Sequence, residues 1–300
     1  MNIRRSLLAT AVATVSITAS QAATLTWDHD ADGTASDGSG NWLDANKWLD
    51  GVTPATWNNA TPDSAIIGSG GTGEWQIDLT GGVTVADATF DNYTGEYRLR
   101  SGSLTIAPGG TLTWGPNTGS NGEDKGGVEF EGSASLIGDA TATIVVDGSY
   151  PTSKASDQFS IRSSNNTAFD GTYDVRNGVL FTENGRPNAN SRIILNGGPG
   201  AGQGAAYSAR WGQTLDRDLG TGAGQIQVIG NRSGFDGQGT SSLIVRLNGT
   251  GPKAVQWGDP NFDQLLEFMR HAYSNDVRHM DHEHTRKMTG KDAILREFGF

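Results

Sequence analysis

Short segments in which apolar and polar residues alternate recur along most of this chain. An alternation with a period of two is typical of a β-strand that has one buried face and one wet face. Turn-forming segments separate these strands, and the 300 residues include 43 glycines, a composition that disfavours helices. We therefore predict a mainly β protein with a core formed by the alternating apolar residues. The expected core includes Leu99, Leu104, Ile106, Leu112, Tyr173, Val175, Leu180, Ile193 and Leu195.

The spacing of the strands favours a solenoid. Around Leu99 to Leu112 the strands follow one another at short and similar intervals. Two or three such strands would form one coil of a β-helix, and each coil would bury its apolar residues against the next. A β-sandwich is the alternative, because the repeats are irregular and the glycine-rich stretch 197–225 is hard to fit into coils.

Residues 1–22 have the features of a secretory signal peptide. Arg4 and Arg5 precede an uncharged stretch, and small residues lead to a cleavage site after Ala22. The uncharged stretch is shorter than a membrane-spanning helix, so we expect an exported protein with no transmembrane segment once the signal is removed. Because the chain has no cysteine, export gives it no disulfides. Its net charge of −11 disfavours nucleic acid as a partner.

Several segments of the chain carry a family resemblance. "LTWDHDADGTASDGSGNWLDANKWLDG" opens the mature chain, and "NNTAFDGTYDVRNGVLFT" has the spacing of a repeat whose core is Y/F-x-G-x-Y/T-x-V-x-x-G-x-L. The chain resembles bacterial secreted proteins with autotransporter-associated β-strand repeats, the PEP-CTERM-type surface proteins of Verrucomicrobia and Planctomycetes. The resemblance covers about residues 22–262 and rests on 25–51, 55–71, 83–106, 165–182 and 219–239.

The resemblance implies a right-handed parallel β-helix, with residues 23–70 as a Trp-rich N-terminal capping region and 71–258 as the repeat solenoid. It also implies an extracellular or outer-cell-surface location and a structural or surface-interaction role, such as a stalk or an adhesin. It supplies no catalytic residue and no cofactor, so we expect no catalytic activity. The alternative is a carbohydrate-binding or polysaccharide-cleaving β-helix, a lyase or a hydrolase, whose partners would be extracellular glycans or cell-envelope components.

Tryptophans are concentrated at the start of the mature chain. Large aromatic side chains at this density are typical of a cover over the open end of a core. We expect that role for Trp27, Trp42, Trp48 and Trp57. The alternative is that exposed indole faces stack on sugars.

Asp28, Asp30 and Asp32 occupy alternate positions before Gly33. Calcium loops use this pattern, because alternate carboxylates fold onto one cation and the glycine permits the sharp turn. The match to an EF-hand loop is incomplete, since its twelfth position holds Ser39 instead of glutamate. A solvated acidic loop is therefore favoured, and calcium bound by the three aspartates is the alternative.

Residues 259–300 differ from the rest of the chain. They hold four of the five histidines and only two glycines, and their apolar residues have helical spacing. We predict a short helical, His- and charge-rich tail, of which 263–300 lies beyond the family resemblance. His279, His282 and His284 could hold zinc, but a solvated polar segment without a common metal centre is favoured.

Overall fold

A computed structural model describes residues 22–115, 126–148, 157–163, 168–183, 187–198, 204–210, 212–230, 232–237 and 243–247. These residues form 21 β-strands and no helix. The mainly β prediction is confirmed. No helix that could span a membrane occurs within these ranges. The predicted signal peptide, apart from Ala22, and the whole predicted helical tail with His279, His282 and His284 lie outside the described residues.

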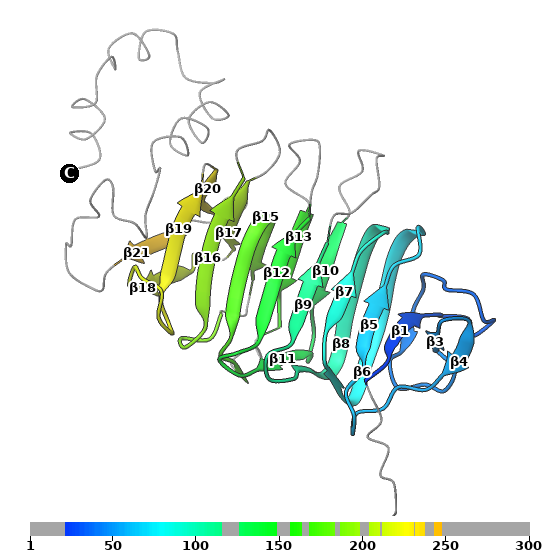
Figure 1. Cartoon of the computed structure of the whole chain (residues 1–300). Coiled ribbons are helices and arrows are strands. Elements are labelled where there is room, and N and C mark those ends of the chain that lie inside the picture. The colour runs from blue at the N-terminus through cyan, green and yellow to red at the C-terminus, as the bar shows by residue number, and fades with distance from the viewer. Residues whose placement is uncertain are drawn as a thin grey trace, which may run out of the picture.

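Most strands belong to rows in which neighbours pair in parallel (Figure 1). In the first row, Ala65 lies opposite Ala88, and Thr111 lies opposite Thr143. The row contains β1 (Thr24–Trp27), β5 (Ser64–Ile67), β7 (Ala88–Phe90), β9 (Thr111–Trp114), β12 (Thr143–Asp147), the start of β15 (Thr172–Thr182), β16 (Arg192–Gly197) and β19 (Ile226–Gly230).

The second row has the same parallel pairing. It contains β2 (Gly40–Asn41), β6 (Thr72–Val85), β8 (Thr94–Ile106), β10 (Gly126–Phe130), β13 (Asp157–Ile161), the end of β15, β17 (Ala205–Ala209) and β20 (Ser233–Gly237). A shorter third row joins the ends of β6 and β8 to β11 (Ser135–Gly138) and β14 (Ala168–Phe169). A separate parallel pair joins β18 (Thr214–Arg217) to β21 (Ile244–Leu247).

The chain visits these rows in turn, so that each strand pairs with the corresponding strand of the next circuit. The colours in Figure 1 accordingly follow the stack from the blue N-terminal strands to the yellow β19 and β20. Gly102 lies where β8 bends from the second row into the third. Its φ is +69°, and an added Cβ would lie 2.2 Å from the carbonyl oxygen of Leu79, so only glycine fits this bend.

Side chains alternate across each strand, and the inward ones form one continuous core. The inward residues of β12, for example, are Ile144 and Val146, both 0% exposed. All nine core residues expected from the sequence are at most 1% exposed, so that prediction is confirmed. The glycine-rich stretch that seemed hard to fit contributes β17 to the second row and β18 to the separate pair.

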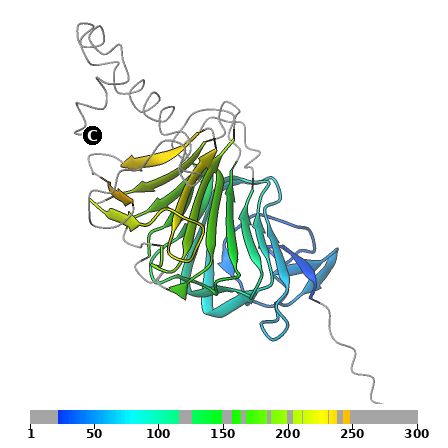
Figure 2. The same cartoon turned by 60° about the vertical axis from the view of Figure 1, so that its left-hand side comes forward.

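The N-terminal end of the stack is closed by a different arrangement. Here β1 pairs antiparallel with β3 (Trp48–Asp50), which pairs antiparallel with β4 (Thr53–Ala55). Figures 1 and 2 show these strands at the opposite end from β18 and β21. Four tryptophans pack beneath them, with ring centroids 4.8 to 5.3 Å apart and at most 5% of each residue exposed. They are Trp27, Trp42, Trp48 and Trp57.

This tryptophan cluster confirms that the four indoles belong to the core at the chain's N-terminal end. The Trp57 indole N–H donates to the carbonyl of Thr84 in β6, and the Trp48 indole N–H donates to the carbonyl of Trp42. Because these side chains are buried, their faces are closed to a sugar ring, and the alternative of sugar stacking is wrong for all four.

Candidate functional site

The structure brings the three aspartates of the predicted calcium loop together. One carboxylate oxygen from each of Asp28, Asp30 and Asp32 lies within 4.8 Å of the others. Asp28 is buried, and the other two are exposed. The Asp28 carboxylate accepts the backbone N–H groups of Ala31 at 3.1 Å and Gly33 at 2.9 Å. The cluster has carboxylate oxygens of the kind that calcium prefers, and its use as a calcium site remains a prediction.

Hydrogen bonds inside this acidic loop change its titration. The pKa of Asp30 is lowered, first by a hydrogen bond with the Asp28 carboxyl group and then by one from the Ser36 hydroxyl. The Ser36 oxygen lies 2.9 Å from an Asp30 carboxylate oxygen and 3.2 Å from one of Asp28. Donor groups within the loop therefore already form hydrogen bonds with the carboxylate oxygens of Asp28 and Asp30.

Other polar residues of the loop bond to neighbouring strands and not to the aspartate cluster. Asp37 accepts hydrogen bonds from the Ser69 and Gly71 backbone and from the buried Tyr97 hydroxyl. Ser39 accepts the backbone N–H of Gln76. Asp37 and Ser39 therefore attach the loop to the second row. The candidate ligands of the aspartate cluster are the carboxylates of Asp28, Asp30 and Asp32.

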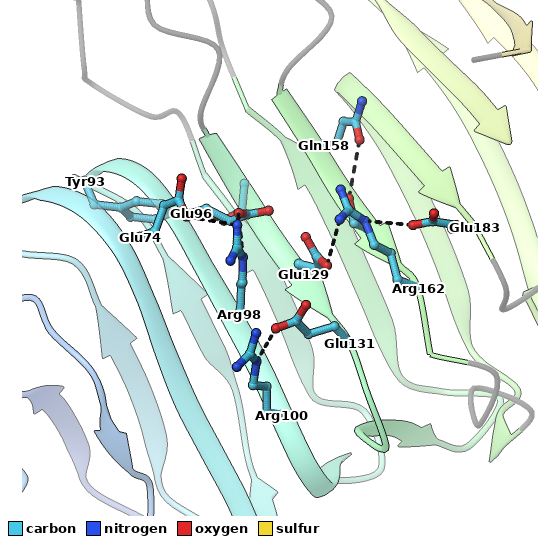
Figure 3. A network of polar contacts seen from close by, with 12 residues as sticks. Glu74, Tyr93, Glu96, Arg98, Arg100, Glu129, Glu131, Gln158, Arg162 and Glu183 are labelled. Atoms are coloured by element: carbon cyan, nitrogen blue, oxygen red, sulfur yellow. Dashed lines mark hydrogen bonds and ion pairs between the residues drawn. The ribbon is translucent and has the colours of Figure 1, made fainter. Parts of the chain in front are cut away.

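A larger polar network, which the sequence analysis did not identify, covers the outward face of the second row (Figure 3). In its central column, backbone pairing places one charged residue of each strand beside a residue of opposite charge on the next. We call this column the charge ladder. Its members are Asp78, Arg100, Glu131, Arg162, Glu183 and Arg210.

Ion pairs connect three of the neighbouring pairs in the charge ladder. Arg100 pairs with Glu131, and Arg162 pairs with Glu183 at 3.3 Å. Arg210 reaches the same Glu183 at 3.5 Å. Each pair of opposite charges on neighbouring strands stabilises a sheet by about 0.2 to 1 kcal/mol. The ladder therefore favours the register in which these strands pair.

From β10 to β17, the column beside the ladder is buried although it faces away from the core. Phe181 is 0% exposed, with the Arg162 and Arg210 guanidinium carbons 5.8 and 5.5 Å from its ring centroid. Ser160 and Ser208, which pair with Phe181 on either side, are 2% exposed. The two arginines thus have cation–π contacts as well as ion pairs.

Glu129 is the most strongly perturbed acid of this network. Its side chain is 1% exposed, and one carboxylate oxygen lies 3.1 Å from an Arg162 nitrogen. The pKa of Glu129 is raised to about 9, first by burial and then by a hydrogen bond with Glu96, and Arg162 offsets these effects only in part. At neutral pH Glu129 therefore keeps its proton, which lets it lie beside Glu96.

A carboxylic acid that keeps its proton at neutral pH can act as a general acid. Proton transfer to a substrate also requires hydrogen-bond contact with the acid, and the Glu129 side chain is almost completely covered. Glu96 is itself tied to Arg98, whose Nε lies 2.8 Å from it. This arrangement suits a fixed polar network that holds neighbouring strands together.

Sequence reasoning missed this site for a physical reason. Alternating charges are visible in "EYRLR" at 96–100 and "EFE" at 129–131, but the partners lie on different strands, far apart along the chain. Only the register determines which residues become neighbours. Comparisons found no matching protein-family model, no similar curated protein and no similar solved structure.

Proposed function

We propose that this chain is an exported right-handed parallel β-solenoid with a structural or surface-interaction role, related to the proteins with autotransporter-associated β-strand repeats. The parallel pairing of corresponding strands from β5 to β19 through one core is the observation that carries the proposal. A sandwich of the usual kind consists of antiparallel sheets, whereas antiparallel pairing among the described strands is confined to β1, β3 and β4.

A structural role fits the way in which the polar groups are used. The charge ladder links neighbouring strands, and the four indoles cover the N-terminal end. A stack of this kind is stabilised by contacts between neighbouring coils, and ion pairs between strands add to those contacts. Such a protein would be a rigid spacer or display element at the cell surface.

Two measurements test this proposal. Small-angle X-ray scattering of the purified protein should give an elongated particle, whereas a compact particle would contradict the solenoid. Antibody labelling of intact cells of the source organism should detect the protein outside the cell. Labelling that requires permeabilised cells would contradict the proposed location.

The second candidate function is polysaccharide cleavage, in which Glu129, an acid that keeps its proton at neutral pH, would be the proton donor if its covered side chain became accessible to substrate. Incubation with bacterial and algal polysaccharides should release no reducing ends and no unsaturated products if the role is structural. Activity that is lost in Glu129→Gln and retained in Glu131→Gln would establish the enzyme instead. Glu131 is a suitable control because it lies on the same face but pairs with Arg100.

A further inference from the structure

The outward face of the first row carries two columns of mostly threonine side chains. Parallel pairing aligns Thr111 with Thr143 and Thr143 with Thr172 in one column. In the other column Thr89 is aligned with Thr113. We call these ten residues of six strands the threonine face. They are Thr24, Thr26, Ser64, Ile66, Thr89, Thr111, Thr113, Thr143, Val145 and Thr172.

The threonine face is regular in two directions. Neighbouring strands of a sheet lie about 4.8 Å apart, and outward residues of one strand are about 6.6 Å apart. Threonine, valine and isoleucine are branched at Cβ, which restricts χ1. Hydroxyl and methyl groups are therefore held in a fixed two-dimensional array before any partner arrives, which lowers the entropic cost of binding.

This face remains open to a partner. All seven threonines are at least partly exposed, and Ile66 is 38% exposed, one of three exposed large hydrophobic residues in the described part of the chain. Val145, at 7% exposed, is the most covered large residue of the array. An exposed array of apolar methyl groups and hydroxyls is suited to an interaction surface.

The charge of the threonine face differs from that of the whole protein. The net charge of the chain is −11, yet none of the ten residues is charged. Two acidic residues also belong to these columns. Asp87 interrupts the first column, and its carboxylate accepts the Thr111 backbone N–H at 2.8 Å, while Asp174 follows Val145 in the second column and pairs with Arg176. The ten hydroxyl-bearing and aliphatic residues themselves fit an uncharged partner, because an ionic partner would gain little from them.

The array contains no aromatic side chain, and sugar rings bind proteins largely by stacking on aromatic faces. The regular spacing instead requires a partner that itself repeats in two directions, because many weak contacts add up only when all are made together. Ice is an uncharged lattice of hydrogen-bond donors and acceptors whose repeats are comparable to the strand spacing. We propose that the threonine face binds the surface of ice crystals.

The experiment measures the growth of ice in solutions of the full chain. We expect the wild-type protein to shape ice crystals and to slow their recrystallisation. Thr113→Lys places a long charged side chain in the middle of the array and should abolish both effects. The matched control is Thr105→Lys, which makes the same change at a partly exposed position of the third row. This control should keep both effects.

Circular dichroism establishes that each variant is folded, and Thr89→Lys replaces Thr113→Lys if the latter does not fold. A wild-type protein without effect on ice overturns the proposal, as does equal activity in the array variant and the control. If the protein sediments with crystalline cellulose or chitin and has no effect on ice, the face binds a polysaccharide, and the proposal is overturned. The remaining outcome is a dimer, detected by analytical ultracentrifugation, that Thr113→Lys abolishes. If the protein also leaves ice growth unchanged, this result overturns the proposal and assigns the face to self-association.

Discussion

The outward side chains of the first row are mostly uncharged from β1 to β12, whereas those of the second row form a network of ion pairs. Both rows are built from parallel strands and enclose the same core. On the first row the aligned columns contain like residues, for example Thr111, Thr143 and Thr172. On the second row the aligned residues alternate in charge, as in Arg100, Glu131 and Arg162.

The difference shows what parallel stacking demands of an outward column. A column of threonines can repeat without penalty, because identical uncharged side chains tolerate one another across strands. A column of like charges would be destabilising, so a charged column must alternate in sign. Glu74 and Glu96 are aligned and depart from this rule, and an Arg98 nitrogen lies 3.0 Å from Glu74 and 2.7 Å from Glu96, which offsets the repulsion.

The largest expected effect is on the pH dependence of stability. The pKa of Glu129 is raised in the folded protein to about 9, from 4.5 for the ordinary carboxyl group. The contribution of the Glu129 side chain to stability is fully present below pH 4.5 and is lost as the pH rises through 9. The free energy of unfolding should therefore fall over this window by up to about 1.4 kcal/mol per pH unit.

Glu129→Gln should abolish this loss, because glutamine keeps the shape of the neutral acid and has no proton to release. Urea denaturation at several pH values across the window measures the slope. Glu131→Gln, on the same face, should keep the wild-type slope. An unchanged slope in Glu129→Gln would show that the acid is already ionised at neutral pH.

The next effect concerns Arg162, which contacts two acids and an aromatic ring of the second row. Its nitrogens lie 3.1 Å from Glu129 and 3.3 Å from Glu183, and its guanidinium lies over Phe181. Arg162→Met should lower the free energy of unfolding by about 2 kcal/mol, less than the full cost for a buried pair because the side chain is 33% exposed.

The matched change on a more exposed ion pair is Arg176→Met. Arg176 pairs with Asp174 of its own strand at 2.8 Å, and its side chain is 51% exposed. This variant should lose less than about 0.5 kcal/mol. Chemical denaturation of both variants provides the comparison, and equal losses would contradict a special role of the ladder.

The sequence was sufficient to predict the core, because burial follows directly from the alternation of apolar residues. Leu104 and Ile106, for example, are buried as expected. It was also sufficient to place the buried tryptophan cluster. The strand β17 was missed because its residues, "AAYSA", include three alanines and only one large apolar side chain.

The candidate site was less predictable, for a different reason. Asp28, Asp30 and Asp32 are close together in the sequence, so their spacing alone was sufficient to predict that their carboxylates form a cluster. Glu129 and Arg162 lie on successive strands of the second row, and their contact depends on the register between β10 and β13. Irregular connections between strands hide this register in the sequence, so neither the charge ladder nor the threonine face could be identified from it.

The smallest expected effect tests whether the outward face of the first row tolerates a hydroxyl at every position. Val145 and Val146 are consecutive residues of β12, with Val145 in the threonine face and Val146 in the core. Val145→Thr extends the column of Thr89 and Thr113, and its hydroxyl would lie beside Thr113 on the outward side of the strand. The free energy of unfolding should therefore change by less than about 0.5 kcal/mol.

Val146→Thr makes the same chemical change on the opposite side of the same strand. There the hydroxyl would be buried among apolar side chains, because Val146 is 0% exposed. A buried hydroxyl without a partner costs about 1 to 3 kcal/mol. Thermal or urea denaturation of the two variants measures the difference directly. Similar losses in both would mean that the outward face of the first row is covered by another part of the protein, and the threonine face would then be closed to any external partner.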